Sequence, residues 1–121
     1  MAGLVVLRRG AATALRRGEV YWVRFDPGEG VEIRKTRPAI VVSNDAANRH
    51  LHSVTVVPLS SNIKRVSPSQ VLVELRGRSS KAMADQIRSV DGSRLVGRRI
   101  GVLPGTAMAE LERVMRIHLA L

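Results

Sequence analysis

Cysteine is absent from this sequence, and only 10 of its 121 residues are acidic. Without cysteine the chain can form no disulfide, offers no thiolate nucleophile and has no cysteine-based zinc site. No apolar run approaches the ~18 residues that a membrane-spanning helix needs. These absences fit a protein of the reducing cytoplasm, and we predict a cytoplasmic location.

Aromatic residues are scarce, and all three lie in one short segment as Tyr21, Trp22 and Phe25. The core must therefore consist mainly of Val, Leu, Ile and Ala, within a composition that is 45% hydrophobic. A chain of 121 residues is too short for two separate cores. We predict one domain, with a sheet or barrel centred on the aromatic segment.

Basic residues outnumber acidic ones by 20 to 10, which gives a net charge of +10. A balance of this kind indicates a polyanionic partner: nucleic acid, an anionic membrane surface or an acidic protein. An arginine-rich solvated surface is the alternative, because arginines also occur along the whole chain. Four arginines and no acidic residue occur in residues 1–17. We predict that this segment is a mobile basic arm outside a domain of residues 18–121, and that it adds electrostatic affinity.

The pattern after residue 18 is mostly that of short strands. Apolar, β-branched or alternating segments predict strands at 20–25, 39–42, 54–59, 71–75, within 81–90, and at 100–103. Thr106 then provides an N-cap for a helix from Ala107 to about Leu119, with Met108, Leu111, Met115 and His118 or Leu119 on one face. The predicted class is α+β, a small and strongly curved antiparallel sheet with a C-terminal helix.

Polar side chains gather where the expected strands begin or end. Pro38 suits the first residue of a strand and holds Arg37 in an extended conformation at the rim of the sheet. The hydroxyl pair Ser60-Ser61 ends the next strand, and the cluster Asp85-Gln86-Ile87-Arg88 follows downstream. An anion-binding guanidinium, hydroxyls and an amide at strand ends predict a site for a phosphodiester.

Four blocks of the sequence resemble successive motifs of the MazF/PemK family, toxins of toxin–antitoxin systems. They are Gly18–Val23, Arg37–Asp45, Val57–Asn62 and Asp85–Arg88. The resemblance implies an SH3-like barrel that usually forms a homodimer. It further implies a sequence-preferring endoribonuclease that cuts single-stranded RNA (mRNA, tRNA or rRNA) without metal or cofactor. Products would carry a 2′,3′-cyclic phosphate and a 5′-hydroxyl, translation would stop, and a cognate MazE-like antitoxin would neutralise the protein.

Three residues are the predicted catalytic set: Arg37, Ser60 and Glu32. The planar guanidinium of Arg37 can bind a phosphoryl group through two hydrogen bonds and is a poor general base, so we assign it charge stabilisation. The resemblance implies an alternative, since members of the family are often described with this arginine in acid–base roles. Ser60 stands where the resembled family usually has threonine, and Glu32 matches an acidic position that would accept a proton. The predicted substrate-binding residues are Gln86, Ser61, Lys35 and Arg88.

Each assignment has an ordinary structural alternative. Arg37 could form a weak surface ion pair with Glu32, which would otherwise be a solvated loop charge. Ser60 could satisfy the backbone of a turn, and Gln86 and Arg88 could be ordinary polar residues of a strand.

Histidines offer a further alternative, because His50 and His52 could act as an acid–base pair near neutral pH. The sequence places both in a turn-like loop, however, which favours a solvated or RNA-contacting role. Three histidines without a carboxylate cluster make a poor metal site, and we predict none. The functional alternatives are a non-catalytic barrel toxin of the gyrase-inhibitor type, a ribosome-associated SH3-like module and an inactive member of the resembled family.

Overall fold

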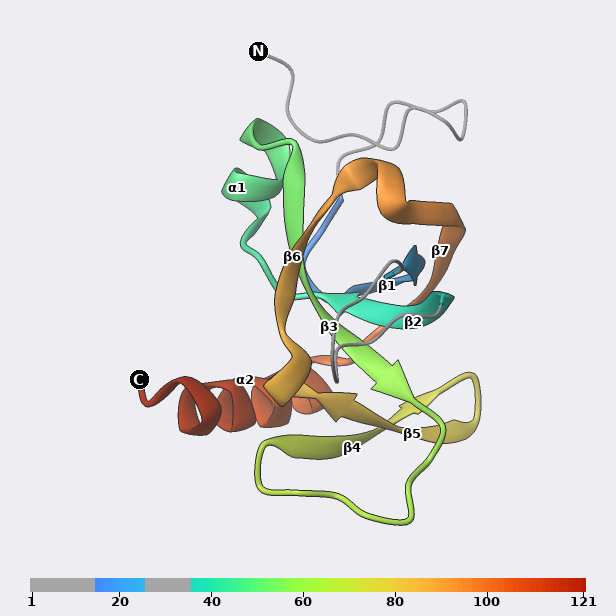
Figure 1. The fold of residues 1–121 in the computed structure, drawn as a ribbon, viewed down its shortest axis with the longest axis vertical. Helices are drawn as coiled ribbons and strands as arrows, with labels where there is room; N and C mark the ends of the chain where they lie inside the picture. The colour runs from blue at the N-terminus through green and yellow to red at the C-terminus, as the bar shows by residue number, and fades with distance from the viewer. Residues whose placement is uncertain (1–14, 26–35) are drawn as a thin grey trace.

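The computed structural model describes residues 15–25 and 36–121 (Figure 1). The strands are β1 (Glu19–Arg24), β2 (Thr36–Val41), β3 (Ser53–Ser60), β4 (Gln70–Leu75), β5 (Arg78–Met83), β6 (Arg88–Asp91) and β7 (Leu95–Val102). The helices are α1 (Asp45–His50) and α2 (Gly105–Leu119), with single 3₁₀ turns η2 (Ala84–Gln86) and η3 (Gly92–Arg94). Neither α1 nor α2 is both long and apolar enough to cross a membrane.

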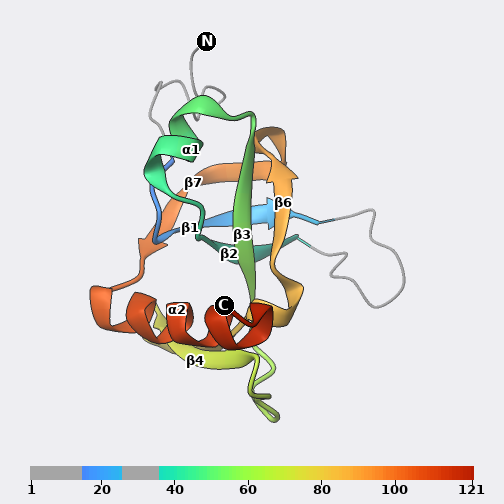
Figure 2. The same ribbon diagram turned by 90° about the vertical axis from the view of Figure 1, so that its left-hand side faces the viewer.

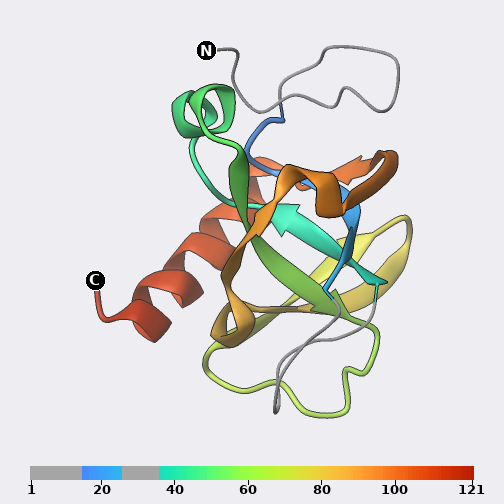
Figure 3. The ribbon, with the colours of Figure 1, turned by 45° about the horizontal axis from the view of Figure 1, so that its top comes forward.

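Strand β3 organises the sheet, because three other strands pair with it. The sheet runs β4-β5-β3-β2-β1-β7, and β6 pairs with β3 off this path. The first half of β3 pairs with β6, its last two residues pair with β5, and its middle pairs with β2. All of these pairings are antiparallel, and together they curl the sheet into a small barrel (Figure 3). The predicted α+β class, with a curved antiparallel barrel and a C-terminal helix, is confirmed.

Both faces of the curled sheet bury side chains, and each face has its own core. The inner core, inside the barrel, takes alternate residues such as Tyr21, Val23 and Val56. The second core takes the intervening residues, such as Val20 and Val57, together with Met108 and Leu111 of α2. Figure 2 shows α2 running along β4 on this second side of the barrel, which we call the helix side. Burial on both faces explains why the strands read as continuous apolar runs.

The C-terminal helix begins earlier than the sequence predicted. Its N-cap is Pro104, which makes no side-chain cap bond, so Thr106 lies in the first turn and its predicted role as N-cap is wrong. The buried residues are Met108, Leu111 and Val114, with Met115 partly buried. His118 and Leu119 are both exposed, so the prediction that one of them lies on the buried face is wrong.

On the exposed side of α2, the hydrogen bond from Arg113 lowers the pKa of the Glu110 carboxyl.

Helix α1 was not predicted, since its residues resemble a loop in composition. The side chain of Asn44 caps it by accepting a hydrogen bond from the Ala47 amide at 2.7 Å. His50 ends this helix and His52 follows it in a bend, so the prediction of a loop is wrong for His50. Because the two histidines do not share a strand, the structure gives no support to an acid–base pair.

The domain begins before Gly18, which corrects the predicted boundary. Leu15 is only 2% exposed and belongs to the inner core. The amide of Arg16 donates to the Glu19 carboxylate at 2.9 Å, and the amide of Arg17 donates to Asp45 at 2.7 Å. Residues 15–17 are therefore part of the fold, while the rest of the predicted arm lies outside the described residues.

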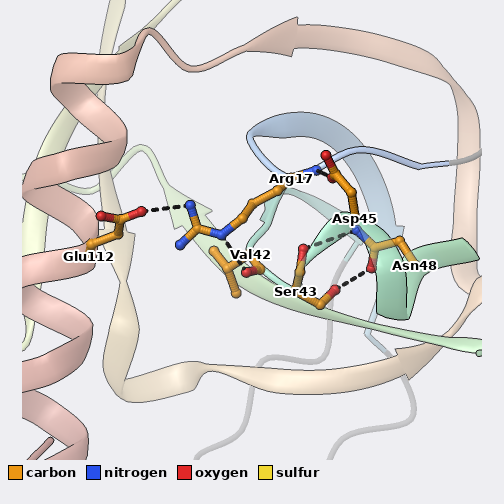
Figure 4. Close-up of polar contacts among 6 residues, drawn as sticks. All are labelled: Arg17, Val42, Ser43, Asp45, Asn48 and Glu112. Atoms are coloured by element: carbon orange, nitrogen blue, oxygen red, sulfur yellow. Dashed lines mark hydrogen bonds and ion pairs between the residues drawn. The ribbon is translucent and has the colours of Figure 1, made fainter.

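Arg17 ties this segment to the end of β2 and to α2 (Figure 4). Its Nε donates to the carbonyl of Val42 at 2.9 Å, and its Nη1 forms an ion pair with Glu112 at 2.7 Å. Beside it, Asn48 is fully buried and bonds with the side chain and the carbonyl of Ser43. These contacts hold the segment and α1 against the barrel.

We predict that a chain starting at Gly18 is much less stable than one starting at Leu15. Loss of Leu15 leaves a cavity in the inner core, and Leu→Ala changes at such sites lower the free energy of unfolding by about 2–5 kcal/mol. Urea unfolding of both truncated chains, with Leu15→Ala in the full chain as a matched variant, measures the difference. Equal unfolding free energies for the two truncated chains would contradict a structural role for residues 15–17.

Candidate functional site

Arg37 is the second residue of β2 and pairs in register with Val23 of β1. Its Nε is buried and has no hydrogen-bond partner among the described residues. A buried donor without an acceptor is unfavourable by roughly 1–3 kcal/mol, and more when the group is charged. A bound anion that supplies the missing acceptor is one explanation for such a group. Arg37 is therefore a candidate residue for binding an anion.

Ser60 ends β3 on the same face as Arg37. The β2–β3 pairing ends at Ala39 and Pro58, and extending its register by two residues places Arg37 opposite Ser60. Opposite residues of antiparallel strands project to one face of the sheet. The Oγ of Ser60 accepts a hydrogen bond from the Asn62 amide at 3.2 Å, which is the turn-stabilising role that the sequence left open. Its own O–H can still donate, so the catalytic role stays a prediction.

Lys81 extends this arrangement, and the sequence analysis missed it. In the β3–β5 pairing it stands directly opposite Ser60. Arg37, Ser60 and Lys81 therefore form a row across β2, β3 and β5, which we call the basic row. The Nζ of Lys81 donates to the carbonyl of Arg65 at 3.0 Å, so that the ammonium is held toward the loop after β3. The lysine was missed because only the pairing of β5 with β3 brings it beside Ser60.

A cavity of about 540 Å³ opens on the helix side of the sheet. The register places the basic row on the other face, since Arg37 pairs with Val23 of the inner core, and Arg37 is the one member of the row that also lines the cavity. We call it the cationic cavity, because three arginines and no acidic residue line its described wall. Its lining consists of Trp22, Thr36, Arg37, Pro38, Leu59, Ser61, Leu75, Arg76, Arg78, Ser80 and Ile100. Arg37 is shared by the cavity and the basic row, and Ser61 is the predicted substrate-binding residue that joins it there. The other two arginines come from the β4–β5 hairpin and were missed by the sequence analysis.

The remaining predicted site residues lie elsewhere or outside the described residues. Gln86 is half-buried in η2 and does not line the cationic cavity. Arg88 pairs with Val56, and its guanidinium lies over the Phe25 ring at 5.6 Å from the centroid, a cation–π contact. Glu32 and Lys35 fall within residues 26–35, which are not described. The roles predicted for these four residues stay predictions.

Chemically, the described part of the site offers cations and hydroxyls. Within residues 15–25 and 36–121, histidine and carboxylate side chains form no group of three that could hold a metal ion. The nearby groups that can bind an anion are the guanidiniums of the cavity and the ammonium of the basic row. Such an arrangement can bind a phosphodiester and stabilise charge that develops on its oxygens.

Comparisons with known proteins agree with this chemistry. A curated relative, endoribonuclease MazF9 of Mycobacterium tuberculosis, is 41% identical, and the match covers 88% of this chain and 98% of the relative. The crystal structure of MazF from Deinococcus radiodurans superposes with a TM-score of 0.79 at 27% identity, covering 89% of this chain and 98% of that one. An endoribonuclease in complex with its cognate antitoxin from a mycobacterial species gives a TM-score of 0.75 at 27% identity, covering 89% and 97%. Residues 16–119 match the family described as PemK-like, MazF-like toxin of type II toxin-antitoxin systems, and the chain belongs to that family.

Proposed function

We propose that this protein is an endoribonuclease toxin that cuts single-stranded RNA and thereby arrests translation. The observation that carries the proposal is Arg37, whose buried Nε has no described partner and which lines a cavity walled by two further arginines. The relative that is 41% identical over most of the chain is named an endoribonuclease, which supports the same activity here.

The reaction uses the 2′-hydroxyl next to the cleaved bond as nucleophile. Its oxygen attacks the phosphorus, the bond to the 5′-oxygen breaks, and the products carry a 2′,3′-cyclic phosphate and a 5′-hydroxyl. Arg37 binds the phosphoryl oxygens and stabilises their growing charge, while Ser60 donates a hydrogen bond to the same group. One proton leaves the 2′-oxygen and one reaches the 5′-oxygen, and Glu32 is the proposed acceptor of the first.

Lys81 is a second cation for this chemistry, since it stands beside Ser60 in register. Its charge raises the local potential for the RNA backbone, whichever hydroxyl or guanidinium contacts the cleaved phosphate. The basic row thus supplies two positive charges, from β2 and β5, and the neutral hydroxyl of Ser60 from β3, and rigid strands hold these groups in place before substrate arrives.

The proposed partners follow from the charge of the chain. With +10 overall, an acidic segment of a cognate antitoxin would compete with RNA for the same basic surface. A homodimer in the cytoplasm is the proposed working form. A structurally similar endoribonuclease is known in complex with its cognate antitoxin, which supports the proposed antitoxin partner.

A cleavage assay with purified protein tests the proposal. Single-stranded RNA should be cut in the presence of EDTA, and the fragments should carry cyclic phosphate and 5′-hydroxyl ends, which are read by phosphatase and kinase treatment. Failure to cut RNA, combined with inhibition of a DNA topoisomerase, would instead favour the non-catalytic barrel toxin. Graded RNA affinity without any cleavage would favour a binding module.

A further inference from the structure

We propose that the cationic cavity is a nucleotide-binding subsite in which Trp22 stacks on a base and Arg76 and Arg78 bind a neighbouring phosphate. The inference rests on the proposed endoribonuclease function and assigns the part of the site that holds the RNA beside the cleaved bond. Arg37 marks the boundary of the subsite, since it lines the same cavity.

Trp22 is the exposed member of an otherwise buried aromatic segment. Tyr21 is 4% exposed and Phe25 is 0% exposed, because both point into the inner core, whereas Trp22 is 42% exposed on the helix side. In the sheet it lies between Pro38 of β2 and Val96 of β7. An exposed indole at a cavity wall offers a flat surface on which any base can stack.

The β4–β5 hairpin forms the opposite wall, and its turn gives it a fixed shape. Arg76 and Gly77 both have positive φ, +53° and +76°, the arrangement typical of tight two-residue hairpins. Arginine rarely adopts this conformation, and here its Nε donates to the Ile100 carbonyl of β7 at 2.9 Å. This bond places the arginine head beside β7, and its other nitrogens make no hydrogen bond to the described residues that would compete with a phosphate.

Gly101 explains how the hairpin comes so close to β7. A Cβ atom at this position would lie 2.7 Å from Cδ1 of Leu75, the last residue of β4. Only glycine allows this approach without a shift of the leucine. The cavity wall is therefore fixed at two points, by this contact and by the Arg76 bond, and it is largely formed before RNA binds.

Shape and charge together select a single-stranded nucleic acid. The cavity volume of about 540 Å³ lies within the ~300–1,000 Å³ that small-ligand sites usually have. An aromatic surface flanked by guanidiniums matches the alternation of bases and phosphates along an unpaired strand. A paired duplex could not offer its base to Trp22, because the base faces would already be stacked.

Trp22 is the only tryptophan of the chain, so its fluorescence reports on this cavity alone. The probe is an RNA oligonucleotide that carries a cleavage site mapped with the wild-type protein and a 2′-deoxy nucleotide there, which prevents cutting. We expect saturable quenching of Trp22 by this oligonucleotide. The same oligonucleotide with abasic positions next to the cleavage site should bind at least ~10-fold more weakly.

Kinetics provide the second readout. Trp22→Ala should raise KM for cleavable RNA by ~10-fold or more and change kcat only a few-fold, while Trp22→Phe should recover most of the affinity. Arg78→Ala should weaken binding to all sequences and lower the salt slope by about one. The matched controls are Val102→Ala and Arg113→Ala, which alter an exposed valine and an exposed arginine outside the cavity.

The outcomes separate this inference from the proposed function. RNA cleavage with an unchanged Trp22 spectrum and an unchanged KM in Trp22→Ala would overturn the subsite and leave the nuclease intact. Emission that changes with protein concentration in the absence of RNA would assign the Trp22 face to a second copy of the chain, and would also overturn it. A wild-type protein that cuts no RNA but is quenched by the oligonucleotide would refute the nuclease and support the nucleotide site.

Discussion

Replacing Arg37 with alanine is expected to lower the rate of RNA cleavage by ~10²–10³-fold, the loss typical for one preorganised donor to a developing anion. The loss should appear in kcat, because the guanidinium interacts most strongly with the charge that develops in the transition state. Initial rates on a single-stranded RNA, measured at saturating substrate, provide the test.

Arg37→Lys should also be impaired, since an ammonium keeps the charge but loses the two parallel hydrogen bonds of the guanidinium. Arg113→Ala removes an equal charge from the exposed side of α2 and serves as the control. Because the Nε of Arg37 is buried without a described partner, Arg37→Ala should unfold at the same or a higher urea concentration than wild type. An Arg37→Ala protein that cuts RNA within a few-fold of wild type would remove the residue from the mechanism.

Strand positions were readable from the sequence because burial on both faces leaves continuous apolar runs such as Val54–Leu59. The β-branched residues of these runs also favour strands, in which they are enriched. Helix α1 was missed for the opposite reason. It spans only Asp45–His50 and its N-terminus is capped by Asn44. Its one buried residue, Asn48, is polar and is held by a hydrogen bond to Ser43. The segment therefore has no periodic apolar pattern from which a helix could be predicted.

The start of the domain was misjudged because Leu15 stands among arginines and alanines. A single apolar residue beside Arg16 and Arg17 has the composition of a solvated arm. Its burial depends on long-range contacts of Arg17 with Asp45, Val42 and Glu112, which lie far away along the chain. The local composition around Leu15 does not show these contacts with residues far away in the sequence.

Some residues of the candidate site could be predicted from the local sequence, whereas others become site residues only through the pairing of distant strands. Arg37 and Ser61 stand at strand ends in polar segments, so both could be named in advance, and both line the cationic cavity. Lys81 and Arg76 become site residues only because β5 pairs with β3 and the β4–β5 hairpin contacts β7. Pairings of distant strands decide such placements, and a single sequence gives no register for them.

Removing or methylating the 2′-hydroxyl of the substrate should have the largest effect of all. A 2′-deoxy or 2′-methoxy nucleotide on the 5′ side of the cleaved bond is expected to abolish cutting at that bond, because the 2′-hydroxyl is the proposed nucleophile. The same substitution one nucleotide further away should leave the rate nearly unchanged and is the matched control.

EDTA should not reduce cleavage of the unmodified RNA. The motivation is chemical, since the chain has no cysteine and its described histidines and carboxylates do not gather into a ligand set. In the proposed mechanism Arg37, Ser60 and Lys81 provide the positive charge and hydrogen bonds that a metal ion would otherwise supply to the phosphoryl oxygens. Fragment lengths on a denaturing gel report the cut, and a cyclic phosphate at the new 3′ end reports the nucleophile. Activity that disappears in EDTA and returns with Mg²⁺ would mean that a metal ion takes part in the reaction. Cleavage that persists at the 2′-deoxy position would mean that water rather than the neighbouring hydroxyl attacks the phosphorus.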